Sequence, residues 1–309
     1  MKLPYTIGFE ITGIIPEYKE KTVKSLSIIE NVPTDETMSL TIAYSCLISS
    51  ELRKKYPKDF EVQKYIDGHC LEFPSPVFTS TEEMDKFYKF VKSQFDKFKI
   101  APHHPITVCG GNHMHFGISN QVVIRNIMRD FTNRWYIPWV FTQPDDTESC
   151  CNIKNDLELC NLQNFVDEGG EFQKFTKTDI INKFYFQILT SDVPIDMLEI
   201  SGLKDMCVGP NIKKGKGTFE FRCIEAPLSF SEFKDQQEFF IRYFNMARKL
   251  KNVSPVSFIS NEQFQNITFS AAIVNFNALL DQLGLNPKRY IKYVERNLLP
   301  RWELGRKRY

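Results

Sequence analysis

Four of the five histidines in the chain, His103, His104, His113 and His115, lie within thirteen residues of one another. Histidine is the commonest protein metal ligand and a frequent acid–base group, because its pKa lies close to neutral pH. Within the segment 110–117, His113 and His115 form a glycine-flanked His-x-His pattern. This segment is therefore the first candidate for metal binding or proton transfer.

Three predicted strands each carry two polar side chains two positions apart, and residues i and i+2 of a strand share a face. The pairs are Glu10 with Thr12, His113 with His115, and Glu220 with Arg222. The alternate positions are apolar and suit a core: Phe9, Ile11, Met114, Phe116, Phe219 and Phe221. If one sheet holds all three strands, its polar face collects carboxylates, imidazoles and a guanidinium. That oxygen-rich set favours Mg²⁺ or Mn²⁺ over a thiolate zinc site. The alternative is an amphipathic sheet with one face in water.

A fourth segment, 66–76, begins with Asp67-Gly68 and enters a predicted strand that carries Glu72. Asp-Gly is typical of a turn, so a simple hairpin with an exposed Asp67 is the alternative to a functional role.

The pattern of apolar residues predicts an α+β protein with an antiparallel sheet and helices packed on its outer face. The expected strands are 5–15, 65–73, 106–118 and 218–224. The expected helices are 36–55, 81–99 with Thr81 as its cap, 120–140 and 229–250, with a helical remainder that turns at 284–287. A loop-rich insertion is expected over 190–210.

The charge is almost balanced, with 39 basic and 38 acidic side chains. This balance argues against a nucleic-acid partner or an anionic membrane held mainly by a positive field. No stretch of about 18 apolar residues predicts a membrane-spanning helix, and the first ten residues lack the apolar core of a signal peptide. The eight cysteines form no Cys-x-x-Cys pair, so we expect reduced thiols and a cytoplasmic location, in a host cell if the protein is viral.

The three strands with paired polar residues and the segment 66–76, taken in their order along the chain, resemble motifs of the putative amidoligases. These proteins are the phage and bacterial branch of the glutamine synthetase / glutamate–cysteine ligase superfamily. The matching motifs are Gly8-Phe9-Glu10-Ile11-Thr12, Asp67-Gly68-His69-Cys70-Leu71-Glu72-Phe73-Pro74-Ser75-Pro76, His113-Met114-His115-Phe116-Gly117 and Glu220-Phe221-Arg222. The resemblance covers residues 5 to 250. It implies an antiparallel sheet shaped as a catalytic funnel that binds ATP and Mg²⁺ or Mn²⁺, and a carboxylate–amine ligase that works through an acyl phosphate.

The resemblance also implies roles for individual residues. Cation ligands would be Glu10, Glu72, His113 and Glu220. His115 would lie near the nucleotide phosphates, and Arg222 would neutralise phosphoryl charge. Such a set suffices chemically, because phosphoryl transfer depends mostly on positioning and charge stabilisation. A catalytic domain over 1–250 and a helical C-terminal extension over 251–309 are expected. The partners would be a small-molecule or peptide carboxylate and an amine.

The chain departs from the family pattern in three places. Thr12 replaces a second acid, His69 replaces a serine, and the stretch 145–152 is acidic where family members often carry arginines. A carboxylate is a much better ligand than a hydroxyl for a hard cation. Either the substrate is unusual, or activity has been lost and the fold serves as a structural or binding protein, such as one in a virus particle or another assembly.

Other interpretations of the same residues remain. A zinc hydrolase could use His69, Cys70, Cys109, His113 and His115, or the His103-His104 pair. Cys109 could be a nucleophile, although a buried inert thiol is commoner. The stretch 209–217 lacks the spacing of a phosphate-binding loop; we expect a mobile basic loop there, with Lys214 and Lys216 able to close over phosphates. The basic end, 301–309, could bind an acidic partner or nucleic acid.

Overall fold

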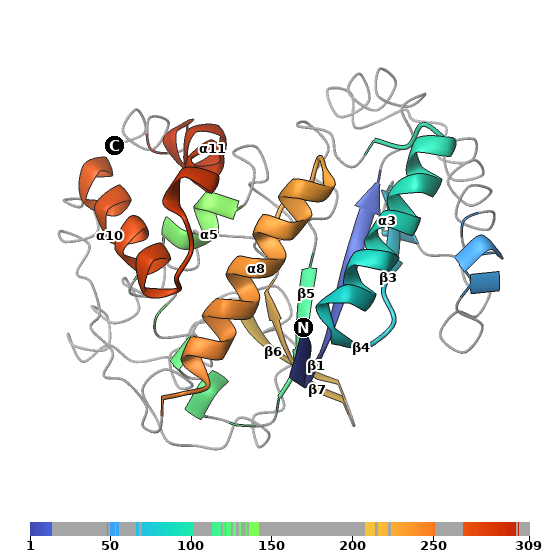
Figure 1. Ribbon diagram of the computed structural model, residues 1–309, viewed down its shortest axis with the longest axis horizontal. Helices are drawn as coiled ribbons and strands as arrows, with labels where there is room; N and C mark the ends of the chain where they lie inside the picture. The colour runs from blue at the N-terminus through green and yellow to red at the C-terminus, as the bar shows by residue number, and fades with distance from the viewer. Residues whose placement is uncertain are drawn as a thin grey trace, which may run out of the picture. The chain divides into compact units, whose positions relative to one another are not determined.

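A computed structural model describes residues 1–13, 48, 50–52, 54–55, 66–67, 70–101, 113–118, 120, 122–124, 126–127, 130, 134, 136–141, 208–213, 216–221, 224–250, 268–300 and 302. Figure 1 shows these elements in colour along the chain. They form two compact units. Unit 1 comprises 1–117 and 224–234, and unit 2 comprises 118–223 and 235–309.

Strand β1 (Lys2–Gly13) is the central element of unit 1. Its second half pairs with β3 (Cys70–Pro74) and its first half with β4 (Phe78–Ser80), while β5 (His113–Gly117) pairs along its other side. The short β2 (Ile66–Asp67) pairs with β3. Every one of these pairings is antiparallel. The predicted mixed architecture, helices with an antiparallel sheet, is therefore confirmed.

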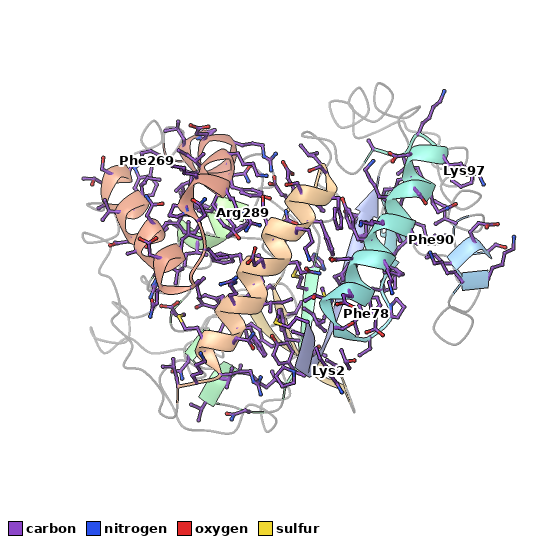
Figure 2. The ribbon with its side chains drawn as sticks, viewed as in Figure 1. Lys2, Phe78, Phe90, Lys97, Phe269 and Arg289 are labelled. Atoms are coloured by element: carbon purple, nitrogen blue, oxygen red, sulfur yellow. The ribbon has the colours of Figure 1, made fainter. Side chains whose placement is uncertain are left out.

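Aromatic side chains fill the space between this sheet and helix α3 (Thr81–Lys97). Phe9 of β1 meets Phe87 of α3 edge to face, with ring centroids 5.5 Å apart. The ring centroid of Phe233 lies 5.2 Å from that of Phe9. Phe233 also stacks on Tyr88, at 4.1 Å between centroids. Figure 2 shows Phe90 and Lys97 further along α3, away from Phe78. Large buried aromatics dominate core energetics, so the packing of Phe9 against Phe87 and Phe233 fixes which face of β1 points inward.

Unit 2 is built from a hairpin and several helices. Strands β6 (Val208–Lys213) and β7 (Lys216–Phe221) pair antiparallel. The helices are α5 (Tyr136–Phe141), most of α8 (Phe230–Ala247), α10 (Phe269–Gln282), the 3₁₀ turn η4 (Pro287–Arg289), α11 (Ile291–Tyr293) and the π-helix η5 (Val294–Leu298). Phe141 contacts Phe239 and Tyr293 at the centre of this core. Gly284 ends α10 with a positive φ of 67°, which glycine adopts without strain.

Several predicted elements are correct, within a few residues at their ends. The strand at 5–15 is β1, the helix at 81–99 is α3, the helix at 229–250 is α8, and the turn at 284–287 follows α10. Helical residues also occur inside the predicted helices 36–55 and 120–140. The rest of those two predictions lies outside the described residues. No helix in the described ranges is both long and apolar enough to span a membrane.

Three local predictions are wrong. The cap of α3 is Ser80, not Thr81, because the extended Ser80 accepts a hydrogen bond from the backbone N–H of Glu83. The predicted strand 65–73 is two strands, since Asp67 pairs with Cys70 in a hairpin. The basic stretch 209–217, expected as a loop, consists mostly of β6 and β7, with Lys213 paired to Lys216. The first of these strands also takes in the end of the predicted 190–210 insertion.

Candidate metal centre

The polar face of unit 1 carries Glu10 and the two histidines of the His-x-His pattern. In the register of β1 with β5, Glu10 is directly opposite His113, and Gly8 is opposite His115. The neighbouring positions Phe9, Met114 and Phe116 are 1% exposed or less and belong to the core. Because strand side chains alternate between faces, burying these apolar neighbours places the Glu10, His113 and His115 side chains together on the opposite face.

Glu10 contacts both imidazoles. Its Oε2 atom lies 2.8 Å from His113 Nδ1, and its Oε1 atom lies 3.2 Å from His115 Nε2. The side chains of His113, His115 and Glu10 are 5%, 18% and 22% exposed, respectively. Each residue offers a possible metal-binding atom, and these atoms all lie within 4.8 Å of one another. The cluster is thus half-buried, with His115 and Glu10 on its accessible side.

The electrostatics of the cluster keep Glu10 ionised. Burial alone would raise the pKa of the Glu10 carboxyl, but hydrogen bonds and charge from His113, and then from His115, outweigh burial and hold that pKa well below its usual range. Metal ligands must be deprotonated to bind. The carboxylate is therefore already in the form that a cation requires.

The geometry of the three residues fits a divalent cation. Two ligand atoms about 2.1 Å from one ion, at right angles to each other, are about 3 Å apart. The two distances from Glu10 to the imidazole nitrogens, 2.8 and 3.2 Å, match that separation. One carboxylate and two imidazoles also form a recognised ligand set for divalent metals.

Two glycines make room for this arrangement. His115 and Glu10 are diagonal neighbours across the strand pair, and the position directly opposite His115 is Gly8, which has no side chain to separate them. At Gly117, an added Cβ would lie 2.0 Å from Thr6 Oγ1. A larger residue at position 117 would force Thr6 or the strand to shift, so the final glycine of the motif permits the close approach of β1 and β5 beside the histidines.

Ser75 fixes β1 beside the cluster, a role that the sequence analysis did not assign. Its hydroxyl accepts a hydrogen bond from the Phe9 N–H at 2.9 Å, and its own N–H donates to the Phe9 carbonyl at 2.7 Å. The same hydroxyl donates to the Pro76 carbonyl. Ser75 thus binds β1 in the gap between β3 and β4, next to Glu10. The Ser-Pro pair at the end of the second motif was the available signal.

Thr12 lies on the same face of β1 as Glu10 and is only 2% exposed. Its register partner on β3 is Glu72, and directly opposite positions of an antiparallel pair belong to one face. The backbone therefore gives Glu72 a position suited to its predicted role, although its side chain is outside the described part. The buried Thr12 brings a neutral hydroxyl where the family pattern has an acid.

The remaining predicted site residues lie on β7, on β3 or outside the described residues. Glu220 lies on β7 of unit 2 and is 3% exposed, between the buried Phe219 and Phe221. Lys216 lies on the same strand, but its side chain is not described. Arg222 and Lys214 lie outside the described residues, as do four residues of the alternative zinc and thiol sites: His69, His103, His104 and Cys109. Cys70 belongs to β3, and its side chain too is not described.

In comparisons with known proteins, no family model and no curated protein matches the chain.

Proposed function

We propose that the protein is an ATP-dependent carboxylate–amine ligase, which forms an amide bond through an acyl-phosphate intermediate. One observation carries the proposal: Glu10 and His113, which come from two motifs 103 residues apart, contact each other at 2.8 Å, and His115 completes the cluster. The order of the four motifs supports the reaction class. The finer fold that we propose is the catalytic funnel of that class, in a cytoplasmic protein.

The proposed cofactors are ATP and a divalent cation, Mg²⁺ or Mn²⁺. The cation, when bound, supplies positive charge that offsets the charge on phosphoryl oxygens. Glu10 and His113 hold it, with Glu72 and Glu220 as further proposed ligands. His115, on the accessible side of the cluster, is proposed to contact both the cation and the nucleotide phosphates.

Other residues of the chain position the substrates. Arg222 is proposed to stabilise the negative charge that develops during phosphoryl transfer, since a guanidinium matches phosphate geometry. Lys214 and Lys216 are proposed to contact the phosphates, now from the β6–β7 hairpin rather than from a loop. The substrates are a carboxylate and an amine, of the size of amino acids or peptides.

The experiment that tests this proposal measures ADP release by the purified full chain while amino acids and peptides are supplied as substrates. A productive pair should raise ADP release, and Glu10→Gln should lower it about 100-fold, because one fixed charge at the reacting phosphates is removed. Glu220→Gln should have an effect in the same direction. Glu295→Gln is the matched control, because this glutamate is exposed and far along the chain from every motif. Equal ADP release by the Glu10 and Glu295 variants would refute the assignment of the site.

A zinc-dependent hydrolase is a second candidate, favoured by the donor set itself. Two histidines and one glutamate are the ligands of a well-known class of catalytic zinc sites, in which water occupies a fourth position. This function predicts zinc retained at one ion per chain after purification, and amide or ester hydrolysis without ATP. Metal analysis by mass spectrometry, followed by hydrolysis assays in the absence of nucleotide, separates it from the ligase.

A further inference from the structure

The three clustered side chains place two imidazole nitrogens beside one carboxylate. His113 Nδ1 lies 2.8 Å from Oε2 of Glu10, and His115 Nε2 lies 3.2 Å from Oε1 of the same carboxylate. The next position on the same face of β1 is the buried Thr12, which offers a neutral hydroxyl and not a second carboxylate.

Such donors discriminate between metals. Mg²⁺ is a hard ion that prefers carboxylates, phosphates and water in octahedral geometry, and it gives up its hydration shell reluctantly. Imidazole nitrogen is suited instead to first-row transition metals. Two imidazole ligands at one cation therefore favour transition-metal dications over Mg²⁺.

Burial strengthens the discrimination. His113 is only 5% exposed, so turning its ring away from the cluster would require neighbouring side chains to move. Glu10 holds both imidazoles through its two oxygens, which orders all three ligands before a metal arrives. A cation that enters the cluster must therefore accept nitrogen ligands.

We infer that the cation site formed by Glu10, His113 and His115 selects a first-row transition-metal dication, such as Mn²⁺ or Zn²⁺, over Mg²⁺. This inference rests on the proposed function only in placing a cation at the cluster. It restricts the proposed cofactor, since it prefers Mn²⁺ to Mg²⁺ where the sequence analysis left both open.

The test uses Mn²⁺ as the probe and the purified full chain without nucleotide. Isothermal titration gives the affinities for Mn²⁺ and Mg²⁺, and pulsed electron paramagnetic resonance of bound Mn²⁺ detects coupling to imidazole nitrogen. We expect Mn²⁺ to bind at least about tenfold more tightly than Mg²⁺, in keeping with the preference of imidazole for transition metals, and nitrogen coupling to be present.

Substitution of one imidazole should shift this selectivity. His115→Glu replaces a nitrogen ligand by a carboxylate at a partly exposed position, so the preference for Mn²⁺ should fall and nitrogen coupling should weaken. His113→Gln should weaken Mn²⁺ binding and also reduce coupling. Val77→Glu is the control for added negative charge, because Val77 is 70% exposed; its metal preference should equal that of the unsubstituted chain. Thermal unfolding of each variant shows that it is folded.

A preference for Mn²⁺ below tenfold, or bound Mn²⁺ without nitrogen coupling, would overturn the inference, as would an unchanged preference in folded His115→Glu. The ligase proposal fails separately. If the chain binds Mn²⁺ with nitrogen coupling but never turns over ATP, the metal preference is supported and the ligase proposal is refuted. If the chain forms amides with ATP but binds Mg²⁺ as tightly as Mn²⁺, the ligase proposal is supported and the metal preference is refuted.

Discussion

Glu10 holds the candidate site together, because both imidazoles contact its carboxylate and neither histidine needs a loop to position it. Glu10 and His113 are direct partners in the register, and His115 reaches Glu10 across the glycine at position 8. The site therefore depends on small residues that permit close approach as much as on the ligands themselves.

Gly117 provides a test of this dependence. In Gly117→Ala the new methyl group would collide with Thr6 Oγ1, which lies 2.0 Å from the ideal Cβ position. We expect a loss of about 1–3 kcal/mol in the free energy of unfolding, typical of overpacking. Denaturant unfolding measures it, and Thr6→Ala in the same chain should restore most of the loss. Full stability of Gly117→Ala alone would contradict the close approach of β1 and β5.

Ser75 provides a second test at the same scale. Ser75→Ala leaves the Phe9 N–H without its hydroxyl partner, and we expect about 1–3 kcal/mol of destabilisation, the usual penalty for a buried unpaired donor. Ser93→Ala is the matched control, because that exposed hydroxyl donates to a carbonyl one turn back in α3 and accepts from the neighbouring Gln94 side chain, so it holds no strand in place. The experiment compares urea midpoints. Identical midpoints for the two variants would show that Ser75 does not secure β1.

Among the elements, α3 shows how a helix start is chosen. Ser80 accepts a hydrogen bond from the Glu83 N–H, and its hydroxyl donates to the Glu83 carboxylate, whereas the Thr81 hydroxyl accepts a hydrogen bond from the N-terminal amine. Loss of a serine cap costs about 1 kcal/mol. Ser80→Ala should therefore lower the melting temperature more than Thr81→Ala. The opposite order would support the cap expected from sequence.

An ion-pair network joins α8 to η4 in unit 2. Arg289 binds Asp235 and Glu238, and Figure 2 labels Arg289. Burial raises the pKa of the Glu238 carboxyl, but Arg289 and then Arg242 lower it by more. A carboxyl whose pKa is depressed on folding stabilises the fold above its unfolded pKa, and this contribution is lost as pH falls through the folded value. Stability should thus decline in acid, and less steeply in Glu238→Gln. Parallel acid profiles of unfolding would contradict this.

The sequence predicts elements better than it predicts their partners. Long amphipathic helices such as α3 and α8 stand out because apolar residues recur at helical spacing. β7 overlaps the predicted strand 218–224, but its partner β6 was missed because it carries glycine, proline and lysine, which are rare in strands and typical of loops. For the site, the motifs identified Glu10, His113 and His115. They could not show that Glu10 faces His113 directly, because register depends on the packing of the whole sheet.

At the scale of the whole molecule, a ligand that binds only the folded chain raises its stability. An ion at 100 times its dissociation constant contributes about 2.7 kcal/mol. Saturating Mn²⁺ should therefore raise the melting temperature of the full chain, and the rise should vanish in Glu10→Gln but persist in Glu295→Gln. Differential scanning fluorimetry measures both. An equal rise in the two variants would place the bound metal elsewhere.

The most direct test of the central claim is isothermal titration of the full chain with a non-hydrolysable ATP analogue, in the presence and absence of Mn²⁺. If Glu10, His113 and His115 hold a cation for nucleotide chemistry, the analogue should bind only with the cation present, and Glu10→Gln should abolish that binding. Nucleotide binding that is the same without the cation or in Glu10→Gln, or no binding at millimolar nucleotide, would contradict the account.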